Sequence, residues 1–401
     1  MIGKNRVVIT GVGVLAANGI GKEAFWNSLL AGESGIGPVT LFDASDLPCR
    51  IAGEVSDFDP ANYFEPKLKA KRWGRFTQLA LAAAQHAFDD ASLSSDFLQS
   101  ISRIPIILGV STSSMDVAAR KSNSYNTVVG IPNAASSAMT YLYNLNSRIQ
   151  TITNGCASSL DAIGEAFSLI ASGRSDIAIT GGADSCMVHY VFDCMSKSRK
   201  LALGNDNPAS ACKPFDLTRT GGVAAEGGAI LILESLEHAQ DRGIKPYCEV
   251  FGAASAADPN TPVVAAGLAD SMTHALDNAG VGCADIDYIN AHGPGDQSVD
   301  VEETNSIKNV FQERAFSIPV SSIKGATGSP MGTGGAMQVI ATALAIQNGV
   351  IPPTTNYKTP DPDCDLDYVP RNPRQLNINY ALVNSHGFGR SNCSVVLGGV
   401  S

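Results

Sequence analysis

The 401-residue chain lacks several features that define whole classes of protein. It has no run of 18 apolar residues, so it offers no membrane-spanning helix. Its N-terminus enters a β-prone stretch directly, without the apolar segment and cleavage site of a signal peptide. Its nine cysteines have no CxxC spacing, which argues against a disulfide framework and a zinc site. We therefore expect a cytoplasmic protein with free thiols and no metal.

Positive charge is also scarce. The chain has 28 Lys and Arg against 38 Asp and Glu, a net charge of −10, which disfavours nucleic acid as a partner. One local exception is a basic cluster within nine residues around Trp73, made of Lys67, Lys69, Lys71, Arg72 and Arg75. Such a cluster can dock an acidic partner protein, although a solvated helix face gives the same pattern.

Apolar β-branched segments alternate with Ala-rich segments, which is typical of a layered α/β fold. In the first half we predict strands at 6–10, 105–110 and 176–180 and a helix at 77–91. After a polar stretch at 240–243 the order recurs, with strands at 248–251, 286–290, 319–322 and 380–384 and helices at 269–279 and 334–348. The sequence thus predicts two similar halves, residues 1–243 and 244–401, in one compact body.

Pairs of glycines follow several of these strands, beginning with Gly11 and Gly13. The first pair lacks the third glycine of a dinucleotide-binding fingerprint, so nucleotide binding is disfavoured. We interpret the glycines as turns that crowd around a shared site, where a missing Cβ lets the backbone approach a substrate.

Cys156 is the strongest candidate nucleophile. A β-prone stretch breaks at Gly155, and an amphipathic helix begins with the cysteine in its first turn. The amide N–H groups and the positive end of the helix dipole stabilise a thiolate at this position. The alternative is a small buried cysteine that only packs.

The second half supplies candidate partners for this thiol. His292 follows the predicted strand 286–290, and strand ends are the usual location of site residues in layered α/β folds. The alternative is a surface histidine. Lys324 follows the next predicted strand, where a solvated strand terminus is the alternative to a catalytic group.

Together these segments resemble the β-ketoacyl-acyl-carrier-protein synthases of the thiolase superfamily, specifically the elongating type I/II condensing enzymes. The resemblance covers nearly the whole chain. It is carried by the order and spacing of short motifs: Arg6-Val-Val-Ile-Thr-Gly-Val-Gly13, Cys156-Ala-Ser-Ser, Ile179-Thr-Gly-Gly-Ala-Asp184, Asp206-Asn-Pro, Pro214-Phe-Asp216 with Arg219, Glu226-Gly-Gly-Ala, Asn290-Ala-His292-Gly, Lys324, Pro352-Pro-Thr and Asn384-Ser-His-Gly-Phe388-Gly.

The resemblance implies a five-layer αβαβα fold of two similar halves, the first carrying the nucleophilic cysteine and the second the histidine and lysine. It implies a homodimer or heterodimer, and substrates held on the phosphopantetheine of an acyl carrier protein, with no further cofactor. The basic cluster would dock that acidic carrier.

The resemblance also implies roles for single residues. Cys156 would hold an acyl chain as a thioester, its own N–H and that of Phe388 would form the oxyanion hole, and Phe388 would gate the acyl pocket. His292 would hydrogen-bond the malonyl thioester oxygen. Lys324 and Glu303 match positions that organise the charge and hydrogen bonds of the site.

The chain departs from the family pattern near the site. Ser329 stands where the family has a second histidine, and a hydroxyl cannot carry positive charge. Pro294 and Asp296 replace hydroxyl residues expected to hold the phosphopantetheine arm, and Asp296 could repel its phosphate. Arg390 replaces a glycine. His386 replaces an aromatic residue and could take over from the missing histidine.

Three functions are compatible with this pattern. The first is decarboxylative condensation in fatty-acid, polyene or polyketide synthesis, favoured because Cys156, His292, Lys324 and Phe388 are all present. The second is a chain-length-factor-like partner subunit, which Ser329, Pro294 and Arg390 favour. The third is an acyltransferase that uses acyl-Cys156 without malonyl decarboxylation. The segment between Gly109 and Cys156 is shorter than the family pattern, so chain length cannot be inferred.

Overall fold

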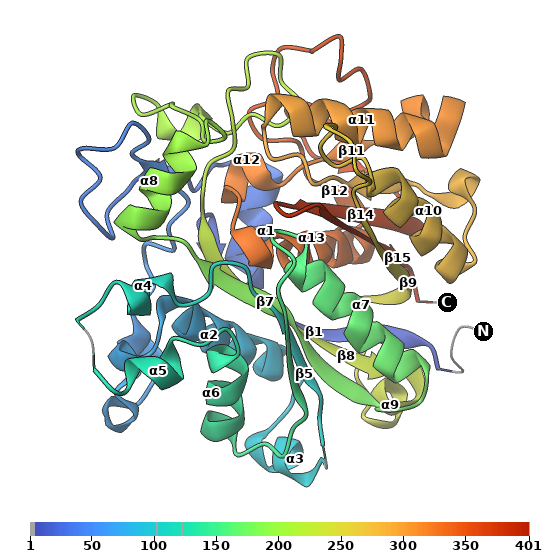
Figure 1. Cartoon of the computed structure of the whole chain (residues 1–401). Coiled ribbons are helices and arrows are strands. Elements are labelled where there is room, and N and C mark those ends of the chain that lie inside the picture. The colour runs from blue at the N-terminus through green and yellow to red at the C-terminus, as the bar shows by residue number, and fades with distance from the viewer. Residues whose placement is uncertain (1–4, 102, 122, 401) are drawn as a thin grey trace.

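The computed structural model describes residues 5–101, 103–121 and 123–400 (Figure 1). Its centre is a mixed sheet of 11 strands among these residues, in the order β11-β10-β14-β15-β9-β1-β8-β7-β5-β6, with β2 paired to β1. The strands of the sheet are β1 Val7–Ala16, β2 Gly19–Ile20, β5 Ile106–Gly109, β6 Ile149–Ile152, β7 Ile177–Ser185, β8 Glu226–Ser235, β9 Cys248–Ala257, β10 Tyr288–Asn290, β11 Val320–Ser321, β14 Tyr380–Gly387 and β15 Ser391–Gly398. The prediction that the N-terminus carries no signal peptide involves residues 1–4, which lie outside the described residues.

The two ends of the sheet have the same topology. In the first half β6, β5 and β7 are parallel neighbours, and β8 and β1 follow as antiparallel strands. In the second half β11, β10 and β14 are parallel, and β15 and β9 follow antiparallel. The halves join where β1 pairs antiparallel with β9, with Val7 opposite Val250. The prediction of two similar halves is confirmed; the boundary between residues 243 and 244 stays a prediction.

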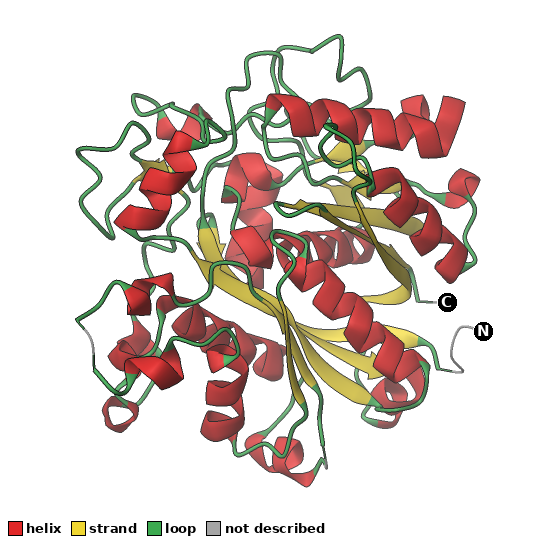
Figure 2. Ribbon diagram, viewed as in Figure 1, coloured by secondary structure: helices red, strands yellow, loops and turns green. Residues whose placement is uncertain are grey.

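Helices separate and cover the two halves of the sheet (Figure 2). The central pair, α7 and α13, contact each other and strands of both halves. On the outside, α2 packs on β1, β8 and β7, whereas α10 packs on β9 and β15 and contacts α11. This gives the five layers αβαβα. The helices concerned are α2 Arg75–Asp90, α7 Ser158–Ala171, α10 Leu268–Ala279, α11 Gln297–Phe311 and α13 Gly334–Asn348.

The glycines of the first strand do not form the turn expected from the sequence. Gly11 and Gly13 lie inside β1, directly under α2. A Cβ on Gly13 would lie 2.0 Å from the carbonyl oxygen of Ala83, and one on Gly11 2.6 Å from that of Ala87. Gly181 and Gly182 likewise lie within β7. Their small size serves close packing of helix on sheet. Gly387, by contrast, is the last residue of β14, and a Cβ there would lie 3.0 Å from the backbone nitrogen of Cys156.

The remaining helices lie around this body. They are α1 Lys22–Ala31, α3 Ser95–Ser100, α4 Met115–Ala118, α5 Asn126–Val129, α6 Ala134–Tyr143, α8 His189–Lys197, α9 Leu236–Asp241 and α12 Lys324–Thr327. Short two-stranded pairs join β3 Gly37–Pro38 to β4 Ile51–Ala52 and β12 Val350–Ile351 to β13 Arg374–Gln375. Over the described residues, every helix is too short or too polar to cross a membrane.

Candidate active site

Cys156 lies between β6 and α7, and the helix begins two residues after it. Its exposed fraction is 6%. Gly155 before it has φ +60°, and a Cβ there would lie 2.6 Å from the carbonyl oxygen of Phe388. The turn after β14 therefore packs against the cysteine loop, and the backbone N–H groups of Phe388 and of Cys156 itself act on the sulfur to lower its pKa.

The thiol is not held as a thiolate. Burial raises the pKa of Cys156 to about 11, although the Lys324 cation and the two backbone donors act in the opposite direction. The backbone N–H groups lower the pKa as the sequence predicts, but this stabilisation does not produce a thiolate, because the cost of burying the charge exceeds it. The sulfur must lose its proton during the reaction.

His292 lies two residues beyond the end of β10 and is buried. Its backbone N–H donates to Glu303 Oε1 at 2.8 Å, and that of Gly293 donates to Oε2 at 2.8 Å. Lys324 Nζ lies 3.2 Å from His292 Nδ1. Burial and the Lys324 charge lower the pKa of His292 well below its usual range, so the ring is neutral. Because an ammonium only donates, Nδ1 accepts and the proton is on Nε2.

Lys324 is the first residue of α12 and is buried. Besides contacting Nδ1, its Nζ donates to the backbone carbonyl of His292. Burial lowers the pKa of Lys324, and the carboxylate of Glu303 opposes that effect. Burial likewise raises the pKa of Glu303, which its two backbone donors oppose. The cation and the carboxylate thus hold the His292 turn from two sides.

His386 lies near the end of β14, which is the parallel neighbour of β10. The rings of His292 and His386 meet edge to face, with centroids 6.0 Å apart and an interplanar angle of 84°. His386 Nδ1 lies 2.9 Å from Asn392 Oδ1, across the β14–β15 hairpin. Burial lowers the pKa of His386, so this ring is also neutral at pH 7.

These side chains share one cavity of about 80 Å³. Cys156, His292, His386, Ser329 and Phe388 line it. Much of the remaining lining is apolar, with Met195, Leu201, Val223, Ala224, Val299 and Met331, and the polar side chains of Ser198, Lys200 and Asp296 also contribute. Phe388 is 62% exposed, so its side chain lies at the surface beside the sulfur.

The residues that depart from the family pattern have different placements. Ser329 lines the cavity, and its backbone is bound on both sides, since its N–H donates to Val223 O at 2.7 Å and its carbonyl accepts from Ala225 N at 3.0 Å. Pro294 also lines the cavity. The Arg390 guanidinium instead donates to the carbonyl of Pro259.

Asp296 does not present a free negative charge to the cavity. It caps α11, accepting from the N–H groups of Ser298 at 3.0 Å and Val299 at 3.1 Å. Lys200 forms an ion pair with it at 3.0 Å. These partners lower the pKa of Asp296 despite its burial. The expected repulsion of a phosphate is therefore offset by the lysine.

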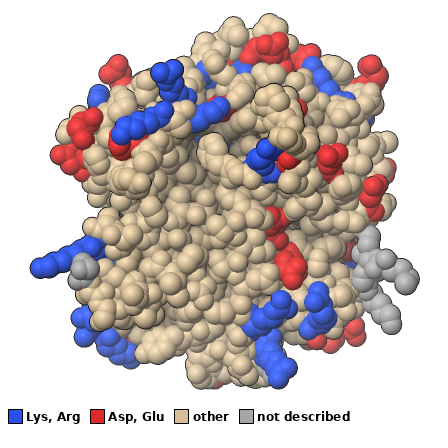
Figure 3. Space-filling model, in the orientation of Figure 1, with Lys and Arg blue, Asp and Glu red and all other residues tan. Residues whose placement is uncertain are grey.

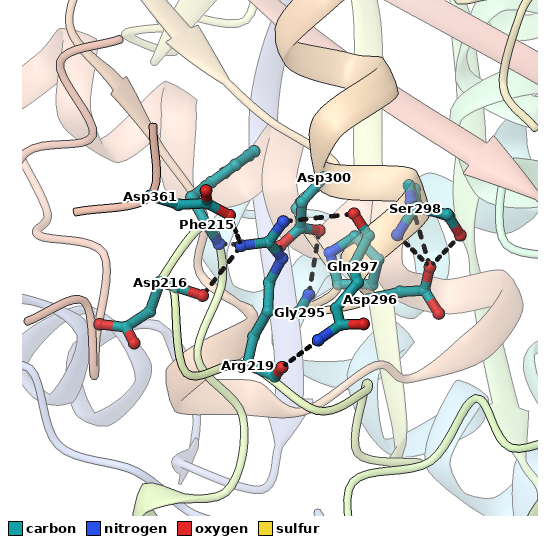
Figure 4. A network of polar contacts seen from close by, with 12 residues as sticks. Phe215, Asp216, Arg219, Gly295, Asp296, Gln297, Ser298, Asp300 and Asp361 are labelled. Atoms are coloured by element: carbon teal, nitrogen blue, oxygen red, sulfur yellow. Dashed lines mark hydrogen bonds and ion pairs between the residues drawn. The ribbon is translucent and has the colours of Figure 1, made fainter. Parts of the chain in front are cut away.

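The turn that carries Pro294 and Asp296 is fixed by a buried polar network (Figure 4). Asp300 accepts from Gly295 N at 3.2 Å and from Phe215 N at 2.8 Å. Arg219 lies beside Asp300 at 3.4 Å and donates to Gln297 O at 3.2 Å. It also donates to Asp216 O at 2.9 Å and to Asp361 at 2.5 Å. The Pro214-Phe-Asp216 motif and Arg219 thus hold this turn in place through hydrogen bonds.

Only four of the five side chains of the basic cluster are exposed. Lys67, Lys69, Lys71 and Arg72 are exposed, and Lys67 pairs with Glu65 at 2.6 Å. Arg75 is a correction to the sequence prediction. Its guanidinium turns inward and makes two hydrogen bonds, 2.7 and 2.6 Å long, to the fully buried Glu226. Arg75 therefore joins α2 to β8 and cannot dock a partner.

Sequence reasoning missed two residues that orient the site. Asn392 holds His386, and Gln338 of α13 donates to Ala291 O at 2.7 Å and Asn384 O at 3.0 Å, which ties together the ends of β10 and β14. The sequence does contain a signal for Asn392: the glycines at 387 and 389 predict a tight turn, and a hairpin around that turn pairs Asn392 with His386. Nothing local marks Gln338, since its role depends on helix packing.

Comparison with known proteins agrees with this geometry. The model of the beta-ketoacyl synthase N-terminal domain matches residues 4–239, and that of the C-terminal domain matches residues 247–358. A putative polyketide beta-ketoacyl synthase 1 of Streptomyces halstedii is 37% identical, with 98% of each chain covered. A 3-oxoacyl-[acyl-carrier-protein] synthase 2 of Synechocystis is also 37% identical, covering 98% of this chain and 97% of the relative.

Solved structures give the same result. The ishigamide ketosynthase/chain length factor superimposes with a TM-score of 0.91 at 32% identity, covering 99% of this chain and 100% of the other. A type II PKS acyl-carrier protein in complex with its ketosynthase gives a TM-score of 0.89 at 31% identity, with the same coverage. Since the family models and these full-length relatives agree, the chain belongs to the beta-ketoacyl synthase family and has its thiolase-like fold.

Proposed function

We propose that this chain catalyses decarboxylative Claisen condensation, in which an acyl group on Cys156 is extended with malonyl-acyl carrier protein in fatty-acid, polyene or type II polyketide synthesis. One observation carries the proposal. The Cys156 sulfur, with two backbone N–H donors, shares a cavity with His292, a neutral imidazole whose Nε2 carries a proton. We also place the protein in the cytoplasm, as expected from its sequence.

The first half-reaction is acyl transfer to Cys156. The sulfur attacks the acyl thioester, and the N–H groups of Cys156 and Phe388 donate to the oxygen that becomes negative. The carrier leaves as its thiol. Covalent capture divides carbon–carbon bond formation into two easier steps.

The second half-reaction uses the His292 side of the cavity. His292 Nε2–H donates to the malonyl thioester oxygen and stabilises the enolate formed as CO₂ departs. The enolate carbon then attacks the acyl-Cys156 carbonyl. Lys324 keeps the donor proton on Nε2 by occupying Nδ1. Ser329 offers only a neutral hydroxyl as a second donor, and removal of one such donor costs roughly 100 to 1000-fold in rate.

We propose that the acyl carrier protein docks on the exposed part of the basic cluster, Lys67, Lys69, Lys71 and Arg72. These side chains lie just before α2 and offer positive charge to an acidic surface. One solved relative is a carrier protein in complex with its ketosynthase, which supports a carrier protein as the partner.

We further propose a dimer, formed with a second copy or with a related subunit, through the edge of the sheet at β6. Among the described residues β6 is the terminal strand of the sheet order, paired with β5. Nearby apolar side chains are exposed, including Val128, Ile131 and Tyr141. Figure 3 shows that the middle of this face, between α4 and α7, carries few charged side chains. A terminal strand beside apolar surface is well suited to association.

A second candidate function is a partner subunit that shapes the chain length made by a complete synthase. Ser329 at the cavity favours it, because it replaces an imidazole with a neutral hydroxyl. The similarity to a ketosynthase/chain length factor supports it as well. The buried thiol with its two donors favours the catalytic assignment instead.

The test is the intact mass of the protein after incubation with acyl carrier proteins of different chain lengths, with Cys156→Ala as the blank. CO₂ release from malonyl carrier protein is followed in parallel. Acylation together with CO₂ release supports condensation. Acylation without CO₂ release indicates an acyltransferase. Neither signal, with activity restored by a second ketosynthase subunit, indicates the partner function.

A further inference from the structure

We propose that His386 is the general base of the acyl-transfer step: its Nε2 takes the proton of the Cys156 thiol, directly or through one water, and returns it to the departing carrier sulfur. The proposal rests on the proposed function and adds a residue to it. The proton balance closes, since the Cys156 S–H bond breaks, the S–acyl bond forms, and the carrier leaves as a thiol.

The hydrogen bonds of Asn392 determine which nitrogen of His386 carries the proton. Asn392 Nδ2 lies 3.1 Å from the carbonyl oxygen of Ala256 and 2.7 Å from Asp258 Oδ1. Both of these atoms only accept, so the amide nitrogen faces them and Oδ1 faces His386. Oδ1 also only accepts, so His386 Nδ1 carries the proton. Neutral His386 therefore has a lone pair on Nε2.

Asp258 fixes the far end of this series of hydrogen bonds from His386 through Asn392. Its carboxylate accepts from the N–H groups of Ala265 at 3.1 Å and Gly267 at 3.0 Å, as well as from Asn392. The asparagine therefore cannot rotate without losing contacts at both ends. An amide that orients an imidazole beside a cysteine serves the same purpose in other thiol enzymes on unrelated folds.

The other polar groups that line the cavity cannot accept the thiol proton. His292 has its proton on Nε2 and receives Lys324 at Nδ1. Asp296 is occupied by Lys200 and by its capping hydrogen bonds. Ser198 and Ser329 offer only hydroxyls, and Lys200 is the cation paired with Asp296. A proton acceptor is required because the buried thiol is protonated at neutral pH. His386 is the cavity-lining group with a basic lone pair left over.

This role differs from the replacement of the missing second histidine that the sequence suggested. A substitute for that histidine must donate to the malonyl thioester, whereas neutral His386 accepts at Nε2. The two imidazoles of the cavity thus have opposite polarity at Nε2, one a donor and one an acceptor. The titratable groups that act on His386 are Asp258, Asp296 and His292.

The experiment measures the rate of Cys156 acylation by intact mass between pH 6 and 9, with the acyl carrier protein that loads the wild type best. His386→Phe restores the aromatic residue typical of the family, and His386→Ala opens space for added imidazole. His274→Phe, on the exposed face of α10, is the matched control.

We expect His386→Phe to slow acylation about 100-fold at pH 7, the ordinary size of a general-base contribution, with a rate that climbs steeply as pH rises. Imidazole should partly restore His386→Ala, and His274→Phe should load like the wild type. Loading of His386→Phe at the wild-type rate overturns the proposal, as does an equal loss at every pH with no imidazole rescue. Absence of acylation in the wild type contradicts the proposed function instead.

Discussion

The two halves of this molecule have one topology but place different chemistry at the same point. In the first half the turn after β6 carries Cys156 at the start of α7; in the second half the turn after β11 carries Lys324 at the start of α12. Both residues are buried, and burial disfavours the charged form of each. The repeated fold supplies two equivalent turns, and the neighbours of each turn determine what it does.

The neighbours explain the difference. The cysteine turn has two backbone donors and an apolar surrounding, which suits a sulfur that becomes charged only during reaction. At the lysine turn, the charge of Glu303 and the His292 carbonyl favour the cation and oppose the effect of burial. The most informative experiments therefore change one turn at a time and measure Cys156 acylation and CO₂ release separately.

The largest effect should come from the first turn. Cys156→Ala removes the nucleophile, so acylation should fall below detection while the melting temperature changes little. Cys194→Ala, at the exposed cysteine of α8, is the control and should load normally. Intact mass spectrometry measures both. Acylation retained by Cys156→Ala would show that another residue is the nucleophile.

The second turn should give the next largest effect. Lys324→Met removes the buried cation that favours the charge of Glu303 and that donates to the carbonyl of His292, so the unfolding free energy should fall by about 1–3 kcal/mol. It also removes the group that keeps His292 Nδ1 an acceptor, so CO₂ release should fall about 100-fold.

Lys308→Met, at the partly exposed pair with Asp365, is the matched control. It should cost about 1 kcal/mol or less and leave CO₂ release unchanged. Denaturant unfolding and the CO₂ assay report the two effects separately. Equal unfolding free energies for the two variants would contradict this structural role of Lys324.

The basic cluster gives a smaller effect and separates docking from stability. Lys71→Glu together with Arg72→Glu should raise the KM for carrier protein about 10-fold at low salt, with the difference shrinking as salt is added. Arg75→Ala should instead destabilise the fold by about 3 kcal/mol, because Glu226 loses its cation. Steady-state kinetics and unfolding curves distinguish the two. An Arg75→Ala protein of normal stability but weak carrier binding would show that Arg75 binds the carrier protein and does not stabilise the fold.

The last comparison changes no residue and concerns the pH dependence of the sulfur. Since the pKa of Cys156 is raised to about 11, the thiolate fraction increases with pH throughout the range from 7 to 10. Alkylation of the free enzyme by iodoacetamide should therefore rise about tenfold per pH unit without a plateau. The loss of one free thiol, followed by peptide mass, measures the rate. A plateau below about pH 8.5, the ordinary cysteine value, would show a thiolate at rest.

Much of this architecture could be predicted from the sequence. The alternation of strand and helix, repeated after residue 243, indicates two similar halves, and the β-prone segment before His292 places that residue at the end of a strand, β10. Those features are local, because they depend on periodicity and on residues that follow strands. The Cys156 turn was also found locally, at Gly155.

What could not be predicted depends on burial and on long-range contacts. The helix terminus suggested a thiolate, but the cost of desolvation, which no local pattern shows, keeps Cys156 protonated. Arg75 was assigned to the docking surface with its neighbours, whereas its partner Glu226 lies 151 residues away along the chain. Gly11 and Gly13 were interpreted as a turn because the close approach of α2 is visible only in the fold.

The central claim is that the cysteine turn and the His292 turn perform separable steps on one cavity. His292→Ala tests it most directly, with acylation and CO₂ release measured on the same preparation. We predict that Cys156 is still acylated at close to the wild-type rate, while CO₂ release from malonyl carrier protein falls at least about 100-fold, since the enolate loses its donor. CO₂ release at the wild-type rate in His292→Ala would contradict the account.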